Sequence, residues 1–126
     1  MSEDSRKILV SKLYNDEAGE SHFIEETLEV TQVNFAPPAP PLYISEGIPA
    51  KQVVHLFLAA GYFGDFHPAP RRQFMTLLSG QLECSTSDGV TRLFTPGNSQ
   101  LVEDTEGRGH STRALTDCVM LVSQLG

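Results

Sequence analysis

Two histidines in this sequence have neighbours whose types and spacing suit a chemical site. The first is His67, which follows Gly61 after five intervening residues and lies in a segment that ends at Gly80. An even number of positions separates His67 from Ala69, Gln73, Met75 and Leu77. An extended chain directs residues of one parity to one side of a sheet, so we expect this set to face the interior.

The second histidine, His110, follows the glycine-rich turn Gly107-Arg108-Gly109. If His67 and His110 meet in an apolar pocket, they could act as a general acid and a general base, because the ordinary pKa of histidine is about 6.5. Gln73 would orient a substrate carbonyl or fix the tautomer of one histidine, since its amide has two donors and an acceptor. These three catalytic candidates suit isomerisation, cyclisation or elimination of a small organic molecule.

The spacing of both segments resembles the two motifs of the cupin superfamily. The first cupin motif has the pattern Gly, five residues, His-x-His, three or four residues, Glu, six residues, Gly, and the corresponding residues here are Gly61, His67, Ala69, Gln73 and Gly80. The second motif ends in Pro-x-Gly, two residues, His, three residues, Asn. Here Thr105 replaces the proline, Gly107 and His110 are kept, and Ala114 replaces the asparagine.

The resemblance implies an all-β fold, an antiparallel jelly-roll barrel, and a homodimer. In metal-dependent cupins the four ligands would correspond to His67, Ala69, Gln73 and His110. Alanine has no donor atom, and the remaining three ligands lack the carboxylate that helps to hold a dication. We therefore expect either a weakly bound divalent metal (zinc, iron, manganese or nickel) at His67, Gln73 and His110, or none. The volume that Ala69 leaves would then admit a ligand.

Three functions remain open from the sequence. The first is a metal-light or metal-free acid/base enzyme, the second a metal-dependent cupin oxygenase or isomerase, and the third a non-catalytic ligand-binding or sensor protein. The predicted ligand-binding residues are Ala69, Arg71, Tyr62 and Met75. Arg71 shares the parity of Gln73 and could pair with a carboxylate or phosphate, although a solvated or interface role would explain it too. Tyr62 could form part of an aromatic rim at the mouth of the barrel, or it could have only a packing role.

Short apolar runs separated by turn residues predict the strands of the barrel. The expected strands cover residues 52–59, 72–78, 81–85, 90–94, 100–103, 110–115 and 118–124. Glycine, proline, asparagine and aspartate mark the turns between them, and no long amphipathic helix is present. We predict a single domain over residues 1–126, with N-terminal strands and a proline-rich strap in 1–50 and the barrel core with both motifs in 51–126.

The N-terminal part is expected to form two strands, over residues 7–14 and 22–35. The segment 36–41, APPAPP, lacks backbone donors at four of its six positions. Proline also fixes its own φ, so we expect a stiff extended strap that lies across one face of the barrel.

Composition excludes several kinds of partner. The net charge is −7, no lysine follows Lys51, and only five arginines lie beyond it, which argues against a nucleic-acid partner. No apolar run reaches the roughly eighteen residues of a membrane helix, and no signal peptide is evident, so we expect a cytoplasmic protein. Cys84 and Cys118 are expected to be buried thiols. The apolar strand 118–122 supports the homodimer that the cupin resemblance implies.

Overall fold

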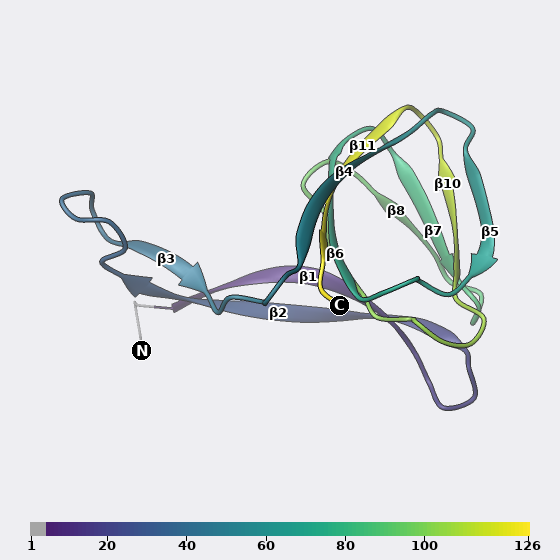
Figure 1. The fold of residues 1–126 in the computed structure, drawn as a ribbon, viewed down its shortest axis with the longest axis horizontal. Coiled ribbons are helices and arrows are strands. Elements are labelled where there is room, and N and C mark those ends of the chain that lie inside the picture. The colour runs from purple at the N-terminus through teal and green to yellow at the C-terminus, as the bar shows by residue number, and fades with distance from the viewer. Residues whose placement is uncertain (1–4) are drawn as a thin grey trace.

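The computed structural model describes residues 5–126, in which the chain forms strands and turns (Figure 1). The strands are β1 (Ser5–Asn15), β2 (Ser21–Val33), β3 (Leu42–Ser45), β4 (Gln52–Leu58), β5 (Phe63–His67), β6 (Gln73–Ser79), β7 (Leu82–Thr86), β8 (Thr91–Phe94), β9 (Ser99–Val102), β10 (His110–Ala114) and β11 (Cys118–Gln124). Within this described range, no helix is long and apolar enough to cross a membrane. The predicted all-β class is confirmed.

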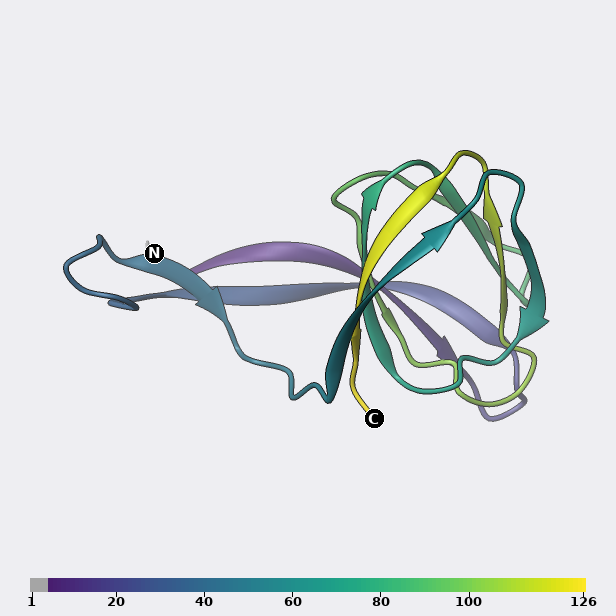
Figure 2. The same cartoon turned by 45° about the horizontal axis from the view of Figure 1, so that its top comes forward.

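The strands form two sheets that enclose the core. One sheet has seven strands in the order β3-β2-β1-β9-β6-β11-β4, and the other has four in the order β5-β10-β7-β8. Neighbouring strands are antiparallel except β1 and β9, which pair in parallel over Ser11 to Leu13. Figure 2 shows the strands of both sheets curving around one interior.

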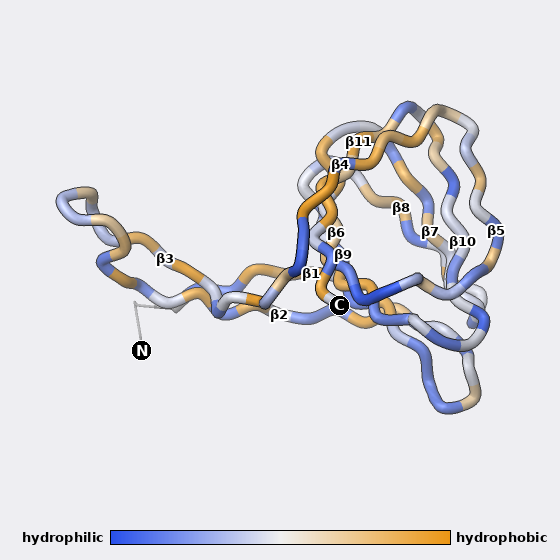
Figure 3. Tube along the Cα trace, in the orientation of Figure 1, coloured by the Kyte–Doolittle hydropathy of each residue, from blue (hydrophilic) through white to orange (hydrophobic). Residues whose placement is uncertain are grey.

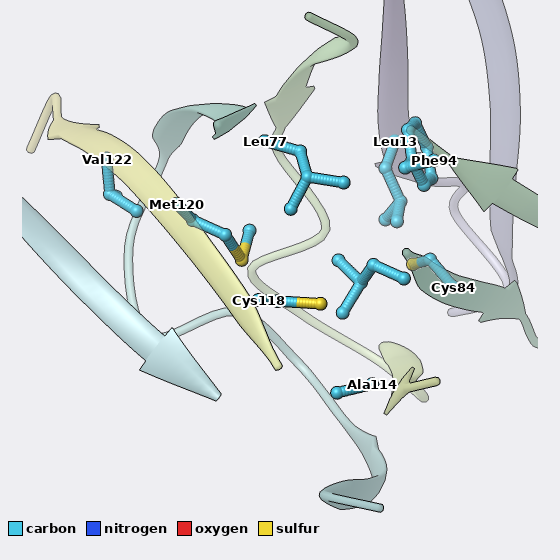
Figure 4. Close-up of a cluster of buried hydrophobic side chains, with 9 residues drawn as sticks. Leu13, Leu77, Cys84, Phe94, Ala114, Cys118, Met120 and Val122 are labelled. Carbon is cyan, nitrogen blue, oxygen red and sulfur yellow. The ribbon is translucent and has the colours of Figure 1, made fainter. Parts of the chain in front are cut away.

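Alternation along the strands builds the core. In β11, Cys118, Met120 and Val122 are buried and alternate with partly exposed residues. Their side chains meet those of Leu13, Leu77, Leu82, Cys84, Phe94 and Ala114 (Figure 4). Each large apolar side chain in such a cluster contributes about 1.5–3 kcal/mol through burial. Both cysteines are buried free thiols, as predicted.

The N-terminal strands extend far beyond the barrel. β1 and β2 stay in register from Ser5 opposite Thr31 to Asn15 opposite Ser21, whereas β1 pairs with β9 only at its barrel end. The free ends of β1 and β2, together with β3, therefore project from the barrel (Figures 1 and 2). We call residues 5–8 and 28–50 the arm.

The proline-rich segment 36–41 is not a strap across the barrel, and that prediction was wrong. It turns between β2 and β3 at the far end of the arm (Figure 1), where the Ala39 N–H donates to the Ala36 carbonyl over 3.0 Å. The prolines still act as expected on hydrogen bonding, because without N–H groups they cannot continue the ladder. The chain leaves the sheet there and returns as β3.

Two short strands were not predicted. β3 has only four residues and directly follows the prolines, and β5 contains Gly64 and Asp65, which are uncommon in strands. Both form because a neighbouring strand supplies the ladder: β2 pairs with β3, and β10 pairs with β5. Tertiary pairing therefore overrides a weak local preference.

A polar cluster ties the β1–β2 turn to the loop before His110. The His22 ring bonds the carboxylate of Asp16 over 2.7 Å and that of Asp88 over 2.9 Å. The neighbouring Ser21 hydroxyl donates to the Gly109 carbonyl over 2.6 Å. The hydrogen bond to Asp16, followed by the bond to Asp88, raises the pKa of His22 against the opposing effect of desolvation. The sequence showed no motif around His22, because its partners come from two other turns.

The same contacts lower the pKa of both carboxyl groups. The hydrogen bond to His22 is the main cause of the lowered pKa of Asp16. For Asp88, the hydrogen bond from the Thr86 hydroxyl lowers the pKa most, and the bond to His22 adds to it. Because the folded pKa of His22 is raised, its contribution to stability is complete below about pH 6.5 and is lost as the pH rises through the folded value. The carboxyl contributions are complete above about pH 3.8 and are lost as the pH falls through the folded values.

We therefore expect His22→Gln to reduce the free energy of unfolding most between about pH 4 and 6.5, and progressively less on either side. Urea denaturation of the variant and the wild type across this range measures the difference. His55→Gln, at an exposed position of β4, is the control. A difference that does not change with pH would contradict the assignment.

Candidate functional site

The structure brings His67 and His110 together. His67 ends β5 and His110 begins β10, and the two are direct partners in the antiparallel register. Side chains at such paired positions lie on the same face of the sheet. The ring centroids are 5.6 Å apart, with the ring planes tilted by 37°. Both rings therefore border the same small volume.

Gly109 makes this pairing sterically feasible. It adopts a φ of +73°, a region that side chains other than glycine rarely occupy. A Cβ at this position would lie 1.9 Å from the carbonyl oxygen of His67. The backbone before His110 therefore passes directly against the end of β5, and only glycine permits that approach.

Hydrogen bonds fix the orientation of both rings. The Nδ1–H of His110 donates to Oδ2 of Asp104 over 2.6 Å, and the Nδ1–H of His67 donates to the carbonyl of Asp65 over 2.7 Å. A neutral imidazole has one donor and one acceptor nitrogen. In each neutral ring Nε2 is therefore the acceptor and the atom available to a ligand.

Asp104 is a candidate site residue that the sequence did not indicate. Its side chain is fully buried, and its carbonyl accepts the N–H of Ala69 over 2.9 Å. Oδ2 bonds His110, whereas Oδ1 has no hydrogen-bond partner among the described residues. The available signal was the carboxylate pair Glu103-Asp104 after strand β9, but the pairing of Asp104 with His110 depends on the path of the 103–109 loop.

A cavity of about 270 Å³ lies beside the two rings. Six of the seven predicted site residues line it, namely Tyr62, His67, Ala69, Gln73, Met75 and His110. Arg71 is exposed and does not line the cavity, so its predicted ligand contact finds no support in the geometry. Most of the remaining wall is apolar and includes Val54, Leu56, Leu58, Leu82, Val102 and Met120.

Gln73 belongs to a chain of amides that joins three strands. The Gln124 amide donates to Oε1 of Gln73 over 3.4 Å and accepts a short hydrogen bond from Gln52. These residues lie opposite one another in the registers of β4, β11 and β6. Because the Gln73 carbonyl accepts this bond, its N–H groups are the part that can donate to a ligand.

Two further polar residues that line the cavity are buried. Gln100 is 9% exposed, and its Oε1 has no hydrogen-bond partner among the described residues. Cys84 is also buried there, and desolvation, with a smaller effect of the Asp104 carboxylate, raises the pKa of its thiol to about 12. Cys84 is therefore a neutral thiol, and Gln100 presents a buried acceptor that a ligand could satisfy.

The donor atoms fit a tightly bound divalent metal poorly. Ala69 contributes none, no carboxylate lines the cavity, and the Cys84 thiol stays protonated. Across residues 5–126, no group of three or more histidine, cysteine, aspartate or glutamate side chains is placed to hold a metal ion. Two neutral imidazoles and an amide leave the charge of a dication uncompensated. A weak metal site at His67, Gln73 and His110 stays a prediction.

The comparison with solved structures shows a cupin fold. An RmlC-like cupin from Shewanella frigidimarina is similar over 92% of this chain and 85% of its own, with 15% identity and a TM-score of 0.50. The cupin domain of Schizosaccharomyces pombe Cnp3 matches over 98% and 86% at 12% identity and a TM-score of 0.46. The similarity to the RmlC-like structure shows a cupin-type jelly-roll fold, as the motifs predicted.

A conserved protein of unknown function, SPY1581 from Streptococcus pyogenes, is 24% identical, with a TM-score of 0.48. The match covers 59% of this chain and 63% of that one, less than two thirds of its length. No protein-family model matches the sequence, and no curated protein is significantly similar to it. At 15% identity the RmlC-like structure shows the fold alone, so the activity has to be argued from the residues of the site.

We expect Ala69→His combined with Gln73→Glu to bind Zn²⁺ at least about 100-fold more tightly than the wild type, because the pair adds an imidazole and a compensating carboxylate. Titration of both metal-free proteins with Zn²⁺ measures the change. Gln73→Glu alone is the control, since Ala69 still lacks a donor. Equally tight binding by wild type and double variant would contradict the poor fit of the native donors.

Proposed function

We propose that this chain is a small-molecule-binding cupin in which His67 and His110 transfer protons without a metal. The observation that carries the proposal is the buried 2.6 Å bond between Asp104 and His110, next to a second histidine at 5.6 Å. A carboxylate on Nδ1 orients an imidazole and stabilises the imidazolium that forms when Nε2 takes a proton. Asp104 is thus a positioning residue, and the two histidines are the catalytic candidates.

The two histidines have different surroundings and suit different roles. His110 is largely shielded, with a side chain 13% exposed, and it has the carboxylate partner. His67 is exposed and bonds a neutral carbonyl, so it can exchange protons with solvent. We assign His110 as the base that removes a proton from the ligand and protonated His67 as the acid that returns one to another atom. Solvent then resets both rings, as an isomerase, cyclase or lyase requires.

The residues that line the cavity also favour one class of ligand. No lysine, arginine, aspartate or glutamate lines the cavity, and its shielded acceptors include Gln100 Oε1 and the Nε2 atom of neutral His110. Acceptors require donors, and a bare carboxylate or phosphate has none to give. We therefore assign a small, neutral and largely apolar ligand that carries hydroxyl or N–H groups.

Asp104 should set the tautomer of His110. In the wild type at a pH where histidine is neutral, we expect His110 to carry its proton on Nδ1 in long-range ¹H–¹⁵N spectra. Asp104→Leu removes the acceptor and should shift the proton towards Nε2, whereas Asp104→Asn keeps an oxygen and should retain more of the Nδ1–H form. A wild-type His110 that is mainly protonated on Nε2 would contradict the proposed base.

Two probes of similar size test the ligand class. At a pH well above the ordinary histidine value, phenol should shift the ring signals of His67 and His110 saturably, because it offers a donor, whereas benzoate should not. His110→Phe should weaken phenol binding at least about tenfold, and His55→Gln, outside the cavity, should leave it unchanged. Preferential binding of benzoate would point to an anionic ligand and overturn this assignment.

A further inference from the structure

A second cavity lies at the seam between the two sheets. It has a volume of about 320 Å³ and is bordered by β1, β2, β8 and the turn that joins β8 to β9. Among the described residues, none lines both this cavity and the one beside His67 and His110. The second cavity is therefore a separate place in the fold, and its chemistry has to be read from its own residues.

The strand order leaves this seam open. β8 is the last strand of the four-stranded sheet, where it pairs with β7 on one side and with no described strand on the other. β1 pairs with β9 over Ser11 to Leu13, and its preceding residues pair with β2 alone within residues 5–126. The second cavity thus lies between an edge strand and a ribbon, at a point where no ladder joins the sheets.

Strand alternation directs a hydroxyl and a carboxylate into the seam. Ser11 is two residues from Leu13, and Glu25 is two residues from Phe23, so each shares the face of a side chain that belongs to the core or packs against it. Ser11 and Glu25 are also direct partners in the register of β1 and β2. The Ser11 hydroxyl oxygen is buried and has no hydrogen-bond partner in the described part of the chain. Because buried polar groups are normally satisfied, this oxygen points to a bound group.

An arginine reaches the cavity from the other sheet. Arg92 lies two residues before the buried Phe94, and its guanidinium is 4.9 Å from the centre of the Phe23 ring. The face of a ring attracts the positive charge but leaves most of the five N–H donors of an arginine unused. No carboxylate of the described residues, that of Glu25 included, forms an ion pair with Arg92. Its donors are therefore available to an anion.

The cavity holds one further donor and an unpaired carboxylate. The side-chain oxygen of Asn98 accepts hydrogen bonds from the N–H and the hydroxyl of Thr95, over 2.9 Å and 3.2 Å. The NH₂ group of Asn98 is thus the part that can donate to a ligand. Glu25 is exposed and has neither an ion pair nor a hydrogen bond with another described residue. The cavity therefore offers donors for an anionic group and a carboxylate for a cationic one.

Apolar side chains form the rest of the wall. Leu9, Leu93 and the buried Phe94 line the cavity, and Figure 3 shows hydrophobic residues in both β1 and β8. Leu9 is 64% exposed and Leu93 52%, so a bound apolar group would shield both from water. Such burial contributes about 25 cal/mol for each Å² of apolar surface. The lining thus combines a cation, an anion and an apolar wall.

We propose that the second cavity binds a small zwitterion with an apolar side chain, of the α-amino-acid class. Arg92 and Asn98 donate to the carboxylate of the ligand, and Glu25 and the Ser11 hydroxyl oxygen accept from its ammonium group. A ligand with one charge leaves either Arg92 or Glu25 without a partner, so it binds more weakly. This site does not depend on proton transfer in the first cavity, and either proposal can fail without the other.

Three probes of matched shape test the ligand class. L-Leucine carries both charges, 4-methylpentanoate lacks the ammonium group, and isoamylamine lacks the carboxylate. In ¹H–¹⁵N spectra at neutral pH, L-leucine should shift the backbone signals of Ser11, Glu25 and Arg92 saturably, and each single-charge probe should bind at least about tenfold more weakly. No saturable shift up to about 50 mM L-leucine, or equal binding of all three probes, would overturn the proposal.

Two substitutions assign the charges. Arg92→Gln should weaken L-leucine binding at least about tenfold and remove its advantage over isoamylamine, whereas Glu25→Gln should remove its advantage over 4-methylpentanoate. Arg113→Gln is the matched control, because Arg113 lies 4.7 Å from the centre of the Phe63 ring but outside the cavity, and the substitution changes the net charge equally. It should leave L-leucine binding unchanged, as should His110→Phe. A loss as large in either control as in Arg92→Gln would place the binding elsewhere and contradict the assignment.

Discussion

The close approach of Gly109 to the carbonyl of His67 is the constraint on which the candidate site depends. Because no Cβ fits there, β10 can begin beside the end of β5 and place the two histidine rings 5.6 Å apart. Hydrogen bonds hold the loop before Gly109 on two sides. The Ser21 hydroxyl donates to the carbonyl of Gly109, and Asp104 accepts hydrogen bonds from Ala69 and His110. A backbone contact thus controls the geometry of two side chains.

The seven-stranded sheet separates two properties of the molecule. Its inner face contributes apolar walls to the cavity, and its outer face continues onto the arm. The alternation of a β-strand makes this division strict, since neighbouring residues such as Leu56 and Phe57 point in opposite directions. Changes to the outer face should consequently leave the candidate proton-transfer pair unaffected.

The sequence predicted the barrel and the convergence of His67 and His110 because glycine spacing and residue parity are local properties. It did not predict Asp104, whose contact with His110 depends on a loop path that no short-range rule specifies. The arm was missed for a related reason: the prolines of 36–41 correctly marked an interruption of hydrogen bonding, but only the long register of β1 and β2 places that interruption away from the barrel. The prediction that Arg71 faces the ligand failed because residue parity applies only within a strand. Prolines precede Arg71, and strand β6 begins only at Gln73.

The most direct test of the central claim is the proximity of the two histidine rings in solution. Nuclear Overhauser effects between ring protons of His67 and His110 report short distances, and the paired strands should give clear cross-peaks. Selective labelling of histidine, with His67→Gln and His110→Gln to assign the signals, makes the measurement unambiguous. We expect cross-peaks between the two rings. Their absence in a folded protein with both ring signals resolved would contradict the shared site.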